Sequence, residues 1–160
     1  GALYCWGEGH LGDNDSFCDG PSPTPRRVYQ TDNNDDVISH FVDVAAGNNL
    51  TCATGYIAGD PPAEPTDIDL WCWGSNARGQ LGIQNGDTDF NADHPRSVSG
   101  SGNGTISGLA TGSGSHACSG VSNHDEVRCW GAGTNYQLGY CETNNDSPAR
   151  LLVGSNACGN

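Results

Sequence analysis

"LWCWGSNARGQLG", residues 70–82, places a cysteine between two tryptophans and follows them with three glycines. Related stretches occur as "LYCWGEGHLG" from Leu3 and "VRCWGAGTNYQLG" from Val127. Self-similarity along a chain is the signature of a repeat architecture, so the stretch is interpreted first as part of a repeat unit. The three stretches stand 67 and 57 residues apart, measured between their cysteines. The unequal intervals indicate fixed segments joined by loops of variable length.

Two further segments recur in the same order. One is a proline followed three residues later by an apolar residue, and the other is an apolar run with alanine and glycine that leads to a cysteine. The first occurs at Pro25–Val28, Pro95–Val98 and Pro148–Leu151, and the second ends at Cys52 and at Cys118. The chain therefore forms a single repeat domain, with units at about 1–53, 54–119 and 120–160.

Short strands are the expected secondary structure. Runs rich in β-branched, aromatic and cysteine residues are separated by clusters of Gly, Asn, Asp and Pro, which is typical of a sandwich, barrel or propeller. Alternation along a strand sends Cys72 to one face and its two tryptophan neighbours to the other. The cysteine is then free to pair with a neighbouring strand.

The cysteine spacing predicts two hairpin disulfides. Cys52 precedes Cys72 by 20 residues and Cys118 precedes Cys129 by 11, with a polar loop between the members of each pair. Two arms of a hairpin have this spacing, so Cys52–Cys72 and Cys118–Cys129 are the predicted bridges. A zinc site is the alternative, but there is no Cys-x-x-Cys pair and the five histidines are scattered.

The order of these segments resembles the regulator-of-chromosome-condensation repeat. The middle unit matches its pattern closely, whereas the first is shortened to "WGEGHLG" and the third has Tyr136 where the pattern has glycine. The middle unit carries Trp73, Gly74, Asn76, Gly79, Gln80, Leu81 and Gly82 at the pattern positions. The resemblance implies a β-propeller, usually a ring of about seven four-stranded blades. We therefore expect an all-β fold of three propeller-type units with short antiparallel strands and long polar loops, stabilised by disulfides.

Composition indicates a secreted, cross-linked protein. Only 34% of the 160 residues are hydrophobic and 24 are glycine, so apolar surface for a core is scarce. Eight cysteines in a chain without methionine or lysine favour an extracellular protein whose leader has been removed, although a reduced intracellular protein is the alternative. Four Asn-x-Ser/Thr triplets predict a glycoprotein, at Asn14, Asn49, Asn103 and Asn145.

Charge and hydropathy exclude two classes of partner. The net charge is −13 and the six arginines are dispersed, so we expect no binding to nucleic acid. No apolar run approaches the roughly 18 residues that a membrane span needs. The sequence also lacks a Gly-x-Ser-x-Gly nucleophile motif, so we predict that the chain is not an enzyme, and a hydrolase is the least favoured interpretation.

Calcium is the one cofactor that the sequence suggests. "DTDFNAD" places oxygen-bearing side chains at alternating positions, as the first ligands of a calcium loop do: Asp87, Asp89, Asn91 and Asp93. However, Ala92 and Val98 stand where such a loop has its glycine and its bidentate glutamate. The interpretation that we favour is that these acidic residues are part of a soluble connector.

The remaining cysteines suggest association between chains. Cys18 and Cys141 lie in matching loops, 12 and 11 residues beyond the tryptophans of the first and third units, and form a plausible third bridge. Cys5 lies in a second hairpin arm with no first arm before it, whereas "LLVGSNACGN" is interpreted as a shortened first arm that ends near Cys158.

Complementary ends of this kind predict strand exchange with a neighbouring subunit. Head-to-tail exchange would give an interchain Cys5–Cys158 bridge and a filament or ring. The function expected from the sequence is that of a self-assembling extracellular scaffold. The alternative is a secreted binding module, a protein inhibitor or adhesin, that uses the loop surfaces of a propeller. Glycans are possible partners.

Overall fold

The fold is all-β. The computed structural model describes residues 1–15, 21–32, 34–58, 68–83, 91–99, 106–121 and 126–139, and the backbone of 144–151. Within these ranges every regular element is a β-strand. The strands are β1 (Tyr4–Gly7), β2 (Ser22–Arg27), β3 (Ile38–Gly47), β4 (Leu50–Ile57), β5 (Asp69–Ser75), β6 (Asn91–Ser97), β7 (Ile106–Thr111), β8 (His116–Val121), β9 (Glu126–Ala132) and β10 (Asn144–Leu151). The fold class expected from the sequence is thereby confirmed.

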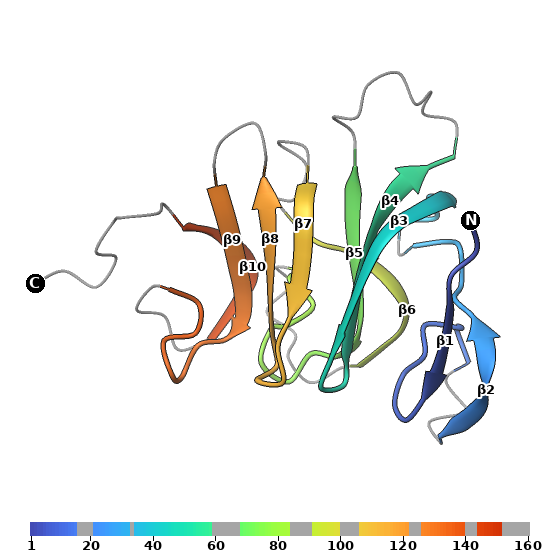
Figure 1. Cartoon of the computed structure of the whole chain (residues 1–160), viewed down its shortest axis with the longest axis horizontal. Coiled ribbons are helices and arrows are strands. Elements are labelled where there is room, and N and C mark those ends of the chain that lie inside the picture. The colour runs from blue at the N-terminus through green and yellow to red at the C-terminus, as the bar shows by residue number, and fades with distance from the viewer. Residues whose placement is uncertain are drawn as a thin grey trace, which may run out of the picture.

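The strands form three antiparallel sheets that stand side by side (Figure 1). Two sheets have four strands each, in the orders β3-β4-β5-β6 and β7-β8-β9-β10, so each is a simple meander. The third sheet holds β1 and β2 only. Propeller blades are four-stranded sheets of this kind. The described chain therefore consists of two complete blades and one sheet with half the strands of a blade.

The sequence units are offset from the sheets. The first predicted unit, 1–53, contains β1 and β2 of the small sheet but also β3 and the start of β4, which belong to the next sheet. In the two four-stranded sheets the Cys-Trp-Gly segment forms the third strand, as β5 does in the sheet β3-β4-β5-β6. The repeat visible in the sequence therefore begins halfway through a blade.

The strand carrying the Cys-Trp-Gly segment lies in the interior of each complete sheet. β5 pairs with β4 along one edge and with β6 along the other. The register shifts between Cys72 and Gly74, where the backbone has a φ of +107°. A Cβ on Gly74 would lie 2.3 Å from the carbonyl oxygen of Asn49. The glycine that follows the tryptophan is thus required by a bulge and by close backbone contact.

The two disulfides lie within the sheets. Cys52 of β4 faces Cys72 of β5, and Cys118 of β8 faces Cys129 of β9, with Cα–Cα distances of 4.1 Å in both pairs. These are the same pairs that the strand spacing predicts. Each bridge therefore joins directly opposed residues of the two middle strands of a blade.

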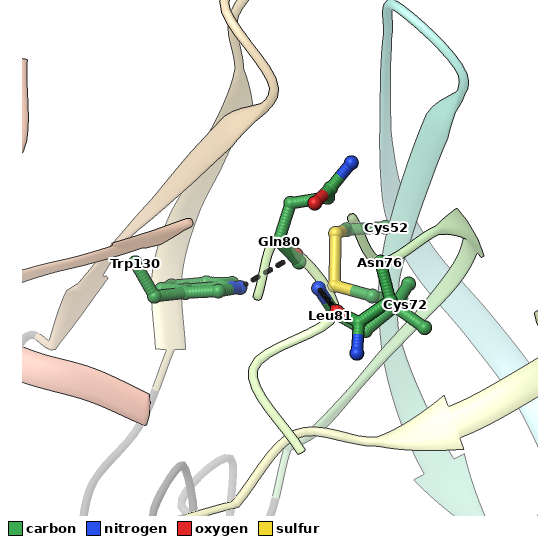
Figure 2. The surroundings of a disulfide bond; sticks show 6 residues. All are labelled: Cys52, Cys72, Asn76, Gln80, Leu81 and Trp130. Atoms are coloured by element: carbon green, nitrogen blue, oxygen red, sulfur yellow. Dashed lines mark hydrogen bonds between the residues drawn. A yellow bond between two sulfur atoms is a disulfide. The ribbon is translucent and has the colours of Figure 1, made fainter. Parts of the chain in front are cut away.

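The core lies between neighbouring sheets, where a tryptophan of one sheet packs on a glycine of the sheet before it. Trp73 and Trp130 are fully buried. Figure 2 shows the indole of Trp130 directed at the turn that holds Gln80, and its Nε1 donates a hydrogen bond of 3.0 Å to the Gln80 carbonyl oxygen. A Cβ on Gly82 would lie 2.9 Å from Trp130 Nε1, and one on Gly12 would lie 2.7 Å from Trp73 Nε1. Both glycines are buried under these indoles.

The end of β10 corrects one expectation. Leu151 was assigned from the sequence to a first hairpin arm beginning "LLVG", but it pairs with Val127 as the last residue of β10. The reason is that the proline-x-x-apolar segment Pro148–Leu151 forms an outer strand, as Pro95–Val98 does around the end of β6. Only residues 152–160 remain for such an arm, and they lie outside the described residues.

No helix in the described part of the chain is long and apolar enough to cross a membrane.

We predict that each hairpin disulfide contributes substantially to stability. Replacing Cys52 and Cys72 together by alanine should lower the free energy of unfolding by about 3 kcal/mol, because the bridge restricts the unfolded chain over a separation of 20 residues. Denaturant unfolding of the oxidised protein measures the change. Cys5→Ala is the control, since it removes a cysteine outside both bridges. An unchanged unfolding midpoint in the double variant would contradict the prediction.

Candidate binding site at the free edge of the first sheet

The first sheet leaves one edge of β1 without a strand. Cys5 of β1 pairs with Arg26 of β2, just as Cys72 of β5 pairs with Arg96 of β6. The opposite edge of β5 is occupied by β4, whereas no described residue forms a strand on that edge of β1. Unpaired backbone N–H and C=O groups on an exposed edge form a template for another strand.

A groove follows this edge. It has a volume of about 350 Å³ and lies between the N-terminal strand and the β3–β4 hairpin. A smaller hollow of about 220 Å³ adjoins it, and the two share Leu3 and Val44 in their linings. We call the two hollows together the β1 slot. Its lining includes Leu3, Tyr4, Cys5 and Trp6 on one side and Val42, Val44 and Ala46 of β3 on the other.

Exposed apolar side chains line part of the β1 slot, together with polar residues such as Glu8 and Asp43. Tyr4 and Trp6 have exposed fractions of 50% and 64%, whereas their counterparts in β5, Trp71 and Trp73, are fully buried. Val42 and Val44 of β3 are also exposed. Contiguous exposed apolar side chains mark surfaces that bind a partner. The arrangement is suited to binding an extended strand by backbone pairing and apolar contact.

Cys5 lies in this slot at the position that forms a disulfide in the other two sheets. It is a free cysteine among the residues that the structure describes. Burial, and to a smaller extent the negative charge of Asp13, raise the pKa of the Cys5 thiol to about 11. Both effects disfavour the thiolate, so the isolated thiol is a weak nucleophile at neutral pH. The raised pKa thus makes Cys5 poorly suited to act as a nucleophile, whereas its position in β1 corresponds to that of the bridged cysteines in β5 and β9.

We predict that the raised pKa controls the alkylation of Cys5. The rate with iodoacetamide in the folded Cys158→Ser chain should still rise about tenfold between pH 9 and pH 10, because the thiolate fraction grows until the pH reaches the pKa. In the unfolded chain, where the pKa returns to 9.0, the rate should level off over the same interval. Peptide mapping assigns the label to Cys5. A plateau near pH 9 in the folded protein would contradict the assignment.

The other cysteines of the sequence prediction lie outside the described residues. Cys18, Cys141 and Cys158 are all in this group. The Cys18–Cys141 and Cys5–Cys158 bridges therefore stay predictions.

The described acceptor asparagines are accessible. Asn14 and Asn49 are both exposed and lie at turn positions with φ values of 61° and 54°. Asn103 lies outside the described residues, and Asn145 is described by its backbone in β10. Asn49 also lines the groove described above, and the glycosylation of both sites stays a prediction.

The calcium interpretation also stays a prediction. Asp87 and Asp89 lie outside the described residues. Asn91 begins β6 and is exposed, while the Asp93 carboxylate lies 2.7 Å from Nδ1 of His94. No group of three or more His, Cys, Asp or Glu side chains suited to a metal ion occurs within the described ranges.

A buried carboxylate that the sequence analysis missed fixes the connection between β2 and β3 to the second sheet. Asp32, in the connection between β2 and β3, is 4% exposed. Its Oδ2 accepts hydrogen bonds from Trp71 Nε1 at 3.0 Å and from Ser97 Oγ at 2.8 Å. Its Oδ1 accepts two more from the backbone N–H groups of Asn34 and Asp36. A buried tryptophan N–H needs an acceptor, but nothing in an Asp- and Asn-rich segment identifies which carboxylate provides it.

We predict that this carboxylate contributes to stability more than its neighbours. Asp32→Ala should lower the free energy of unfolding by about 2–3 kcal/mol, because it removes the acceptor of the buried Trp71 indole N–H and one partner of the Ser97 hydroxyl. Thermal unfolding measures the loss. The control is Asp35→Asn, which removes an exposed carboxylate from the same connection at a φ of 64° that asparagine tolerates. Equal effects of the two substitutions would count against the assigned role.

The sheets and the joints between them define a propeller-type repeat protein. The sequence matches the family of the regulator of chromosome condensation (RCC1) repeat over residues 1–54 and 69–118. The chain belongs to this family. No curated protein sequence matches it.

Solved structures of RCC1-like proteins have the same fold. One is Prp20p from Saccharomyces cerevisiae, with a TM-score of 0.70 and 20% identity, covering 94% of this chain and 34% of that chain. Another is in the structure of Kap60 bound to yeast RCC1 (Prp20), with a TM-score of 0.69 and 21% identity, covering 94% and 33%. Human WBSCR16 gives 0.67 and 20%, covering 95% and 33%. The chain thus spans about a third of the length of these proteins.

Proposed function

We propose that the chain is an extracellular structural scaffold that assembles head to tail through the β1–β2 sheet. The observation that carries the proposal is the edge of β1 with which no described strand pairs, where Cys5 stands at the disulfide position of the other two sheets. An extended segment that pairs with β1 would take the place that β4 has beside β5. This is β-augmentation reinforced by a covalent bond.

The proposed occupant is residues 152–160 of a second copy of the chain. These residues follow β10, the outer strand of the third sheet, and they carry Cys158. Within the chain, the segment that follows the outer strand β6 leads to the first strand of the next sheet. Residues 152–160 would therefore lead toward the next sheet of an assembly, which is the β1–β2 sheet of the second copy.

Extracellular location is part of the same proposal. The two described disulfides, the even number of cysteines and the accessible Asn14 and Asn49 support it. Gsp1p, histones and Kap60 are named with Prp20, of which this chain spans a third. We do not extend these partners to it, because a scaffold role requires only the surfaces described above.

A binding module is the second candidate function. The exposed Tyr4, Trp6, Val42 and Val44 of the β1 slot favour it, since the same apolar surface would accept a strand from another extracellular protein. A protein inhibitor or adhesin would bind in this way. Under this candidate, Cys5 stays unlinked to Cys158 in the purified chain.

The decisive experiment distinguishes copies by isotope. Chains labelled with ¹⁴N and ¹⁵N are mixed, denatured, reduced and refolded together under oxidising conditions, and are then digested without reductant for mass spectrometry. Head-to-tail assembly predicts Cys5–Cys158 peptides that join one light and one heavy half, together with rings or filaments in electron micrographs. Cys5→Ser is the control and should abolish these peptides. Linked peptides of one isotope only, or an unlinked Cys5, would refute the proposed assembly.

A further inference from the structure

The Cys52–Cys72 disulfide is enclosed between the second and third sheets. Both cysteines have exposed fractions of 0%. Trp73, the next residue of β5, packs on Gly12 of the first sheet, so alternation along the strand directs Cys72 to the opposite face, where the third sheet stands (Figure 1). The bridge shares a core cluster with Trp130 of the third sheet. A reagent in solution therefore cannot contact either sulfur atom in this structure.

A turn of the second sheet lies beside the bridge. Figure 2 shows the disulfide next to the turn of residues 76–82, with Trp130 on the other side of that turn. Asn76 holds the turn in shape, because its Oδ1 accepts a hydrogen bond of 3.0 Å from the Leu81 N–H. The side chains of Asn76, Gln80 and Leu81 are all buried. The turn is therefore part of the enclosure of the disulfide.

Trp130 binds this turn to the third sheet. Its Nε1 donates a hydrogen bond of 3.0 Å to the Gln80 carbonyl oxygen. Its ring packs so closely on Gly82 that a Cβ there would lie 2.9 Å from Nε1. Both contacts are lost if the third sheet moves away from the second. Separation of the two sheets would therefore release the turn and uncover the disulfide.

We propose that reduction of the Cys52–Cys72 disulfide is coupled to separation of the second and third sheets. A dithiol reacts with the bridge only after the sheets have separated, because thiol–disulfide exchange needs a thiolate in contact with a sulfur atom. The bridge is thus a redox-sensitive element inside the boundary between two blades. Only contacts within one chain are involved, so the coupling does not depend on the proposed head-to-tail assembly.

The reaction consumes one dithiol for each bridge. A thiolate of the dithiol attacks the sulfur of one cysteine, forms a mixed disulfide with it and releases the other cysteine as a thiolate. The second thiolate of the reagent then displaces the first cysteine, and the reagent leaves as a cyclic disulfide. The dithiol loses two electrons, and its two protons pass through solvent to the two cysteines.

The coupling acts in both directions. The core between the sheets is close-packed, and two separate thiols need more room there than a bonded pair of sulfur atoms. Reduction should therefore make separation of the sheets easier, just as separation permits reduction. Reducing conditions would weaken the boundary while the backbone pairing of β4 with β5 remains.

The first test follows reduction of the bridge by dithiothreitol, with alkylation at timed intervals and peptide mapping. Trp130→Phe should raise the reduction rate about tenfold, because it removes the buried hydrogen bond to Gln80 and keeps an aromatic ring on Gly82. Trp71→Phe is the matched control and should leave the rate nearly unchanged. It removes a buried indole hydrogen bond of the same length, to Asp32, on the opposite face of the second sheet.

Urea distinguishes separation of the sheets from complete unfolding. Separation exposes less surface than unfolding, so the reduction rate should rise less steeply with urea than the equilibrium constant for global unfolding does. Equal slopes, or equal acceleration by the Trp130 and Trp71 variants, would overturn the coupling. Thermal unfolding verifies that both variants are folded.

Hydrogen exchange tests the reverse direction. The Cys118→Ala/Cys129→Ala chain leaves Cys52–Cys72 as the only disulfide among the described residues. Reduction of this chain should speed exchange of the Trp130 indole N–H, relative to that of Trp71, at least about fivefold as measured by NMR. The ratio is decisive because a loss of overall stability alone would speed both exchanges equally. An unchanged ratio would refute the effect of reduction on the boundary.

Discussion

The packing of a tryptophan on a glycine of the neighbouring sheet is the interaction on which the architecture depends. An indole fits against backbone only where no Cβ intervenes, so the closing glycine of each turn is fixed by contact as well as by its positive φ. The contact also determines which faces of the sheets meet, and the buried core of Leu50, Trp73, Leu81 and Trp130 gathers around it. In a chain with few apolar residues, these large side chains provide much of the buried surface.

The sequence revealed the elements that repeat, because repetition is visible without coordinates. The Cys-Trp-Gly segments predicted strands, and their spacing from Cys52 and Cys118 predicted which cysteines face each other. It did not reveal where a sheet begins, since the segments recur in the same order and any of them could open the unit. Asp32 was missed for the opposite reason, because its hydrogen bonds to Trp71 and Ser97 join distant segments at a single place in the described chain.

The candidate site was only partly visible in the sequence. The absence of a hairpin arm before Cys5 could be inferred from the order of segments, but the apolar slot depends on Val42 and Val44, which belong to the next sheet. The described residues give the first sheet two strands, and Val42 and Val44 line the hollows beside it. The β1 slot is therefore defined by how two sheets are arranged in space more than by any residue motif.

The location of the disulfides has a mechanical consequence. Both described bridges join strands within a blade, whereas Trp130 contacts the preceding blade by packing on Gly82 and by its hydrogen bond to the Gln80 carbonyl oxygen. Under tension along an array of such blades, each blade would resist shear because a disulfide joins its two middle strands. The non-covalent contacts between blades would break first. Extension would then proceed by reversible separation of neighbouring blades, with the hairpins intact. The array would behave as a series of stiff blades joined by flexible contacts.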